Sequence, residues 1–164
     1  MSDHELDALL LTLARSRVRF VVIGGIAVGV HGYVRGTKDV DVCPDPSADN
    51  LRELAAVLRG LDARQVELAD DFAPEELPFD PLDPDDLAEG GNFRLHTRLG
   101  ALDIMQWIPG INADAAYPVL AADAITVELR DAELEICSLA HLRRMKETAQ
   151  RPQDLLDLAN LPER

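Results

Sequence analysis

Apolar residues near the start of the chain follow first a helical and then an extended spacing. Four leucines recur three or four positions apart, as on one side of a helix: Leu6, Leu9, Leu10 and Leu13. They predict a helix over residues 3–16. A compact β-branched run at 19–23 predicts a strand that ends at a Gly-Gly turn. Polar and apolar residues then alternate at 39–43, which predicts a second strand.

The rest of the chain continues this succession. We expect helices over 26–31, 47–59, 112–122, 138–149 and 153–161, and strands over 92–97, 101–107, 124–129 and 133–136. Residues 69–91 have several prolines, many carboxylates and little periodicity, which favours a loop or a partly mobile insertion. This order of elements predicts an α+β fold, or an α/β fold with a mixed sheet, in one domain over 1–164. Residues 138–164 would form a C-terminal helical extension.

The charge is strongly acidic and unevenly distributed. The formal net charge of the 164 residues is −14, which disfavours non-specific binding to nucleic acid or to an anionic membrane. Residues 62–89 hold 11 acidic side chains and one basic one. Much of the acidity therefore belongs to this one segment, and the sequence permits a local basic site elsewhere in the chain.

Two further features concern the cellular compartment. We expect the two cysteines, Cys43 and Cys137, to be free and Cys43 to be a buried thiol, because nothing else suggests a disulfide-stabilised chain. The start of the chain lacks a secretory signal pattern, and no apolar stretch approaches the roughly 20 residues of a membrane span. We expect a cytoplasmic protein without a membrane partner.

Candidate chemistry begins with two aspartates on the second predicted strand. Asp39 and Asp41 share one face, because alternate side chains of a strand point the same way. Two neighbouring carboxylates repel each other, and a divalent cation such as Mg²⁺ would relieve that repulsion. On its own the pattern is equally compatible with a solvated strand.

A turn before this strand adds to the pattern. The first strand ends at Gly24-Gly25 and runs into a predicted helix, where free N–H groups and close backbone approach would suit a phosphate. A plain tight turn is the alternative. Thirteen positions lie between Gly25 and Asp39, enough for a helix and a loop that return the chain beside the first strand.

These residues resemble a known family. The run FVVIGGIAVGVHGYVRGTKDVDV resembles the signature of the nucleotidyltransferase superfamily, in which a Gly-Gly or Gly-Ser turn precedes Asp-X-Asp or Asp-X-Glu on the next strand. Its spacer is most similar to the minimal and abortive-infection-type, antitoxin-like members, and the antibiotic-modifying adenylyltransferases share much of it. The resemblance implies the nucleotidyltransferase fold, a DNA polymerase beta-like palm core, here with C-terminal helices.

The resemblance also implies roles for individual residues. It implies catalytic and metal-binding roles for Asp39, Asp41 and Asp103, and nucleotide contacts by Gly24, Gly25, Arg35, Thr37 and Lys146. Asp103, on the predicted strand 101–107, would be the third carboxylate; the alternative is that it points to solvent. Arg35 could contact the triphosphate or pair with a carboxylate such as Asp39. Lys146 could contact phosphate or lie on a solvated helix face, and Arg151-Pro-Gln-Asp154 and Asp157-Leu resemble the family's ending.

The function implied is an Mg²⁺-dependent transfer. Two Mg²⁺ ions and an NTP, with ATP the expected one, would deliver NMP to a hydroxyl of a partner protein, a small molecule or RNA. The acidity disfavours RNA, and a toxin-like partner in a toxin-antitoxin system would fit the minimal members. The alternative is an inactive nucleotide-binding or partner-binding member, since many active relatives have Gly-Ser where this chain has Gly-Gly. A third possibility is an interaction protein that docks through residues 62–89.

Two other side chains have more than one interpretation. We expect His31 to pack or hydrogen-bond at the end of its helix. Trp107 with Pro109 could border a base-binding pocket, although core packing is the favoured interpretation.

Overall fold

The computed structural model describes residues 3–66 and 79–164. Its helices are α1 (Asp3–Arg15), α2 (Gly24–Val30), α3 (Ala48–Gly60), α4 (Pro84–Ala88), α5 (Ala116–Ala121), α6 (Leu139–Ala149) and α7 (Pro152–Asn160). Its strands are β1 (Phe20–Ile23), β2 (Asp39–Pro44), β3 (Arg64–Gln65), β4 (Asn92–Thr97), β5 (Gly100–Met105), β6 (Ile125–Leu129) and β7 (Ala132–Ile136).

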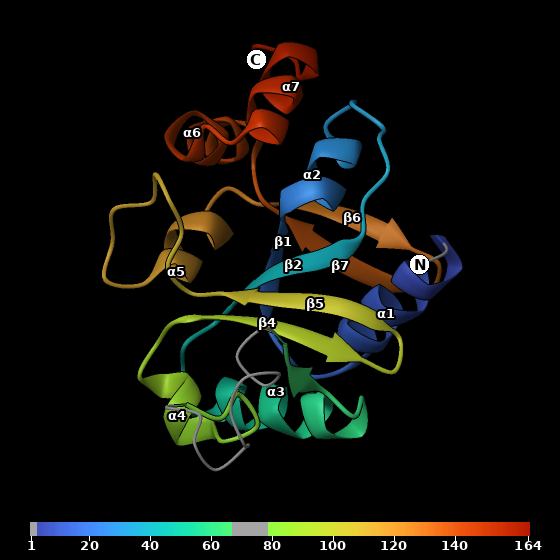
Figure 1. The fold of residues 1–164 in the computed structure, drawn as a ribbon, viewed down its shortest axis with the longest axis vertical. Coiled ribbons are helices and arrows are strands. Elements are labelled where there is room, and N and C mark those ends of the chain that lie inside the picture. The colour runs from blue at the N-terminus through green and yellow to red at the C-terminus, as the bar shows by residue number, and fades with distance from the viewer. Residues whose placement is uncertain (1–2, 67–78) are drawn as a thin grey trace.

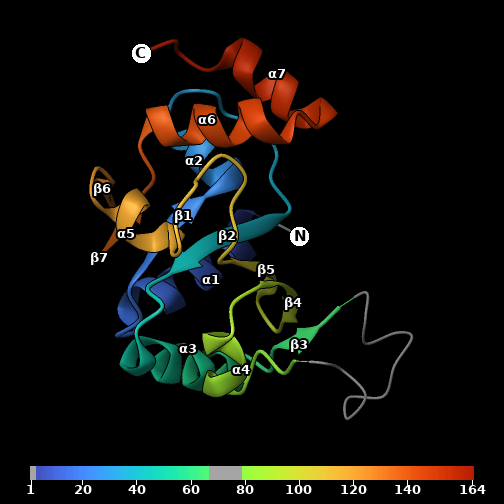
Figure 2. The same cartoon turned by 90° about the vertical axis from the view of Figure 1, so that its left-hand side faces the viewer.

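A seven-stranded mixed sheet is the centre of the fold, in the order β3-β4-β5-β2-β1-β7-β6 (Figure 1). The pairs β2/β5 and β1/β7 are parallel, and the other neighbours are antiparallel. The prediction of a mixed-sheet α/β fold is therefore confirmed. Helices α6 and α7 stand beyond one end of the sheet, next to α2, whereas α3 and α4 lie at the opposite end (Figures 1 and 2).

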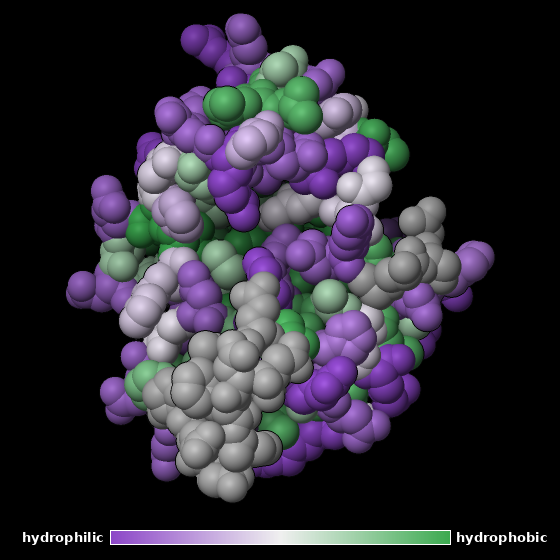
Figure 3. Space-filling view, viewed as in Figure 1, coloured by the Kyte–Doolittle hydropathy of each residue, from purple (hydrophilic) through white to green (hydrophobic). Residues whose placement is uncertain are grey.

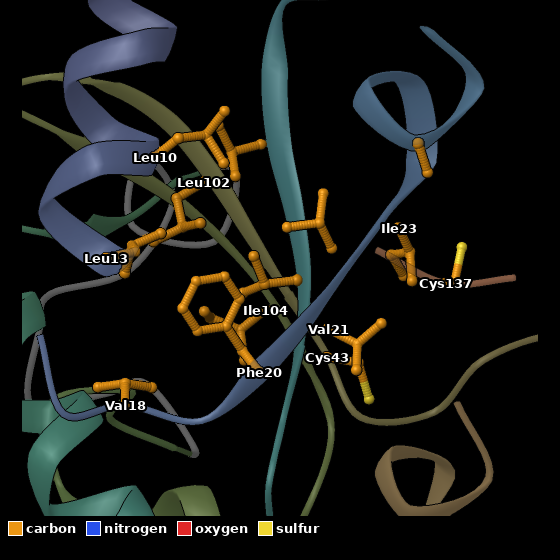
Figure 4. Close-up of a cluster of buried hydrophobic side chains, with 14 of the residues drawn as sticks. Leu10, Leu13, Val18, Phe20, Val21, Ile23, Cys43, Leu102, Ile104 and Cys137 are labelled. Atoms are coloured by element: carbon orange, nitrogen blue, oxygen red, sulfur yellow. The ribbon is translucent and has the colours of Figure 1, made fainter. Parts of the chain in front are cut away.

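One face of the sheet forms the main core against α1. Leu10 and Leu13 of α1 face Phe20 of β1 and Leu102 and Ile104 of β5 (Figure 4). Each of these side chains is at least nine-tenths buried, and full burial of such a side chain contributes roughly 1.5–3 kcal/mol. The leucine spacing that predicted the helix is therefore the spacing that buries it on the sheet.

The opposite face is apolar only in part. Val21 and Cys43 pair across β1 and β2 and point away from α1, as Ile23 does (Figure 4). Helices α2 and α5 contact β1 and β2. Cys43 and Cys137 are free and buried, as expected, and burial raises the pKa of each thiol to about 12. On the same face β2 also carries its two aspartates, so the candidate site begins where this second core ends.

The structure corrects several element boundaries. Residues 84–88 form α4 inside the stretch expected to be a loop, because Asp83 caps a helix that has Pro84 in its first turn. The predicted helix over 112–122 is shortened to α5, since a start at 112 would put Pro118 at an interior position that needs an N–H. β5 ends at Met105, β3 was not predicted, and α2 begins two residues earlier than expected. The part of the predicted loop at 69–78 lies outside the described residues.

No helix in the described ranges 3–66 and 79–164 has the length and apolarity needed to cross a membrane.

Candidate functional site

Three aspartates converge at the middle of the sheet. Parallel pairing of β2 with β5 sets Asp41 directly beside Asp103, and Asp39 lies two residues earlier on the same face of β2. One carboxylate oxygen from each residue lies within 4.8 Å of the others. Asp103 is only 8% exposed, so the alternative in which it points to solvent is wrong. The sheet register thus assembles the set of carboxylates that the sequence singled out.

The negative charges of the three carboxylates repel one another. Burial, followed by the charges of Asp39 and Asp103, raises the pKa of Asp41 to about 7, and the charge of Lys146 opposes this shift. Asp41 therefore takes up a proton far more readily than an ordinary aspartate. A divalent cation would replace that proton, and carboxylate oxygens are the kind of ligand that Mg²⁺ prefers. Asp39, Asp41 and Asp103 are thus suited to hold such an ion.

The Gly-Gly turn packs directly against this cluster. Gly24 has a φ of +70°, and a Cβ there would lie 2.0 Å from Oδ2 of Asp41. A Cβ on Gly25 would lie 1.9 Å from Oγ1 of Thr37. Gly24 therefore requires glycine for its backbone conformation and close approach, and a side chain at Gly25 would displace the Thr37 hydroxyl. The two glycines of the turn therefore pack against Asp41 and Thr37, which follow them by 17 and 12 positions in the sequence.

Arg35 and Lys146 meet on one buried carboxylate. Arg35 donates from Nε and Nη2 to the two oxygens of Asp157, at 2.7 and 2.9 Å. Lys146 lies 2.9 Å from Asp157 and 2.9 Å from Asp154. Of the two alternatives for Arg35, the structure has the carboxylate pair, with Asp157 in place of Asp39. Lys146 is 6% exposed, so its solvated alternative is wrong.

Asp154 and Asp157 are structural residues of the site region to which sequence reasoning gave no individual role. Asp157 is fully buried. Burial would raise its pKa, but hydrogen bonds from Arg35, Lys146 and Gln153 outweigh burial and lower the pKa to about 2. The available signal was an inverted pattern on α7, where these acids face inward while Leu155 and Leu156 are exposed. Figure 3 shows hydrophobic side chains at the upper end of the molecule, the end that α7 occupies.

Two other cations border the carboxylates. Arg151 bonds Asp154, the main reason that its pKa is raised, and the charges of Asp41 and Asp39 add to the shift. Its side chain is 72% exposed, so it is a cation beside the cluster that solvent can reach. Arg94 pairs with Asp103 in the β4/β5 register, and its Nε lies 3.8 Å from Oδ2 of Asp103. Sequence reasoning assigned a role to neither, because each depends on a contact across the fold.

The structure also tests the sequence predictions for His31 and Trp107. Nε2 of His31 lies 2.7 Å from the carbonyl oxygen of Cys137, to which it donates. The expectation of a hydrogen bond at the helix end is confirmed. Trp107 is 65% exposed, so the favoured interpretation of core packing is wrong.

Two comparisons with known proteins bear on this site. No protein-family model matches the chain, and no curated protein sequence matches it significantly. The function of the chain is therefore inferred from its residues and their geometry.

The first prediction compares Gly25 and Gly29 of α2, which differ in what an added Cβ would contact. Gly25→Ala should destabilise the protein by about 1–3 kcal/mol, because its Cβ would displace Thr37 and approach Nη1 of Arg35 at 3.3 Å. Gly29→Ala is the matched control: no atom lies within 4 Å of its Cβ, so the variant should gain about 0.5–1 kcal/mol from helix propensity. Urea unfolding followed by circular dichroism measures both. Equal effects of the two substitutions would contradict this packing of the turn.

The second prediction concerns pH in the absence of metal ions. The folded-state pKa of Asp41 is raised from 3.8 to about 7, so folding binds a proton over this range. The contribution of Asp41 to the free energy of unfolding is fully present below pH 4 and is lost as the pH rises through 7. Asp41→Asn does not titrate and should be more stable than the parent at pH 8, by about 1–3 kcal/mol.

Denaturation in EDTA at pH 5 and pH 8 tests this prediction. Asp49→Asn is the control, since Asp49 is an exposed aspartate on α3 paired with Arg52. It should leave the difference between the two pH values unchanged. An Asp41→Asn variant that loses stability at pH 8 relative to the parent would contradict the crowding of the three carboxylates.

Proposed function

We propose that this protein is a divalent-metal-dependent nucleotidyltransferase that moves a nucleoside monophosphate from an NTP, with ATP the expected donor, to an acceptor hydroxyl. One observation carries the proposal: carboxylate oxygens of Asp39, Asp41 and Asp103 lie within 4.8 Å of one another. The turn at Gly24 packs against Asp41, and backbone without side chains there would permit close approach of a phosphate. The resemblance of residues 20–42 to the superfamily signature supports the same proposal.

The proposed reaction is an in-line displacement at the α-phosphorus. The acceptor oxygen forms a bond to the α-phosphorus while the bond from that phosphorus to the bridging oxygen breaks, and pyrophosphate leaves. Mg²⁺ bound by the carboxylates would stabilise the attacking and the leaving oxygens. Asp39, Asp41 and Asp103 would hold the cations, and the carboxylate of Asp103 would also accept the hydroxyl proton. The raised pKa of Asp41, about 7, is consistent with a cluster that is complete only with a cation.

The surrounding residues divide between phosphate contact and support. Thr37 and the N–H groups of the turn lie next to Asp41, where the β- and γ-phosphates would extend. Arg151 is exposed beside the carboxylates and would neutralise phosphate charge. Arg35 and Lys146, which the resemblance assigned to nucleotide contact, are engaged with Asp157. Either side chain would contact phosphate alongside Asp157 or in exchange for it.

The acceptor class is narrowed by charge. A net charge of −14 disfavours an RNA end, which needs a basic track. A small molecule or a partner protein, including a toxin-like one in the cytoplasm, fits the proposal better.

A second candidate is a non-catalytic nucleotide-binding or partner-binding protein of the same fold. It is favoured by the engagement of Lys146 with Asp154 and Asp157 and by Gly25, which supplies no hydroxyl to phosphate. Docking through the acidic segment 62–89 would be a third function, but its residues 67–78 lie outside the described structure.

The third prediction is a loss of transfer on substitution of the cluster. With Mg²⁺ and each α-labelled NTP, and host lysate as the acceptor source, the parent should label an acceptor. Asp39→Asn, Asp41→Asn and Asp103→Asn should reduce labelling to background, because each removes a ligand or the proton acceptor. The exposed Asp49→Asn should retain it.

Calorimetry with ATP and Mg²⁺ separates the candidates. Binding without labelling would favour the non-catalytic protein. No nucleotide binding, or labelling that survives all three substitutions, would contradict the proposed function.

A further inference from the structure

A cavity of about 140 Å³ lies on the sheet face that carries the three aspartates. Its walls come from four parts of the chain: Cys43 and Pro44 of β2, Gln106 and Trp107 after β5, Gly90 after α4, and Tyr117 of α5. Figure 1 shows the elements beside which these wall residues lie, α4, α5 and the end of β5. The cavity is separate from the Gly-Gly turn and has no role in the site described above.

Strand register relates the cavity to the carboxylates. Asp39, Asp41 and Cys43 point to one face of β2, so the cavity begins one same-face position beyond Asp41, about 7 Å along the strand. Ile23 pairs with Asp41, and the chain then enters the Gly-Gly turn on the side of Asp39. The three aspartates therefore lie between the turn at one end and the cavity at the other.

The geometry of in-line displacement relates this order of turn, aspartates and cavity to the proposed reaction. The attacking and leaving oxygens lie on opposite sides of the phosphorus. With pyrophosphate at the turn, the acceptor must approach from the side of the cavity. We propose that the cavity is the acceptor subsite, and that it takes a small, uncharged or positively charged ring compound bearing a hydroxyl group. This inference rests on the proposed function.

The polar groups of the cavity are fixed in place by hydrogen bonds. The Asn92 side chain accepts from the backbone N–H groups of Gln106 and Trp107 and donates to the carbonyl of Trp107. The side-chain amide of Gln106 donates to the carbonyl of Leu87 at 3.0 Å. Oε1 of Gln106 is buried and has no hydrogen-bond partner among the described residues. That oxygen is closed to solvent, so a turn of the Gln106 side chain toward the cavity would be needed for an N–H or O–H of the bound molecule to satisfy it.

The charge and shape of the lining also restrict which molecules can bind in the cavity. Its charged side chains are Glu89 and Asp114, and no basic side chain of the described residues lines it. An anionic acceptor would therefore be repelled. The exposed indole of Trp107, held against Gly90, and the ring of Tyr117 offer surfaces on which a ring or a cation can stack. The exposed Trp107 would thus serve as a binding surface, which a tryptophan packed in the core could not provide.

The fourth prediction uses Trp107 as the probe, because it is the one tryptophan of the chain. Its indole N–H gives a single resonance in a ¹H–¹⁵N spectrum. We titrate three compounds that share a ring and differ in charge: 4-hydroxybenzylamine, 4-hydroxybenzyl alcohol and 4-hydroxybenzoate. The first two should shift the resonance saturably, and the benzoate should bind at least about tenfold more weakly, a difference of about 1.4 kcal/mol.

Variants separate the cavity from the surrounding surface. Gln106→Leu should weaken the alcohol about tenfold through loss of its acceptor. Ala115→Leu, in the cavity wall, should abolish the shift, whereas Ala113→Leu on the same segment is exposed, does not line the cavity and should bind as the parent does. Circular dichroism confirms that each variant is folded.

Two results would overturn the inference: no saturable shift with any of the three compounds, or equal binding by the two alanine variants. In the first case, a saturable shift by adenosine would identify the cavity as a base site. The shift reports binding alone and should persist in Asp39→Asn. A failure of the transfer assay is therefore distinguishable from a failure of the cavity inference.

Discussion

The pairing of Asp41 with Asp103 across β2 and β5 is the constraint on which the rest of the site depends. Parallel register puts the two carboxylates side by side, and Asp39 brings a third to within 4.8 Å. The cost of this crowding appears in the pKa of Asp41, raised to about 7. The backbone at Gly24 comes so close to Asp41 that only glycine fits. A cluster that costs stability and requires a special turn is better explained by a ligand than by folding.

The C-terminal helices connect this cluster to the rest of the fold. Lys146 of α6 and Arg35 of the loop before β2 share the buried carboxylate of Asp157 on α7. Removing one partner from such a buried set typically costs about 3–5 kcal/mol. The network therefore fixes α7 and the loop that carries Thr37 at one edge of the aspartates. The cavity bounded by Gln106 and Trp107 lies at the other edge, so the two ends of the site are built by different parts of the chain.

Local patterns predicted the site better than they predicted its surroundings. Alternation on β2 and the spacing of Gly24, Gly25 and Asp39 were enough to place Asp39, Asp41 and the turn, because these depend on near neighbours in sequence. Asp103 was assigned through the family resemblance, since its position depends on the pairing of β2 with β5. The partners of Arg35 and Lys146 could not be derived, since α7 turns its acids inward and its leucines outward. Short helices such as α4 and α5 lack the periodicity that marks longer ones. The exposure of Trp107 depends on Asn92 and Gly90, which no local rule relates to it.

The most direct test of the central claim, that Asp39, Asp41 and Asp103 bind divalent cations together, is a crystal structure with Mn²⁺ and a non-hydrolysable ATP analogue. Anomalous scattering locates Mn²⁺ independently of the surrounding atoms. The account predicts two peaks about 3.5–4 Å apart, coordinated by carboxylate oxygens of the three aspartates and by phosphate oxygens, with the phosphate chain against the Gly24-Gly25 turn. An ordered nucleotide with no anomalous peak at these carboxylates would contradict it.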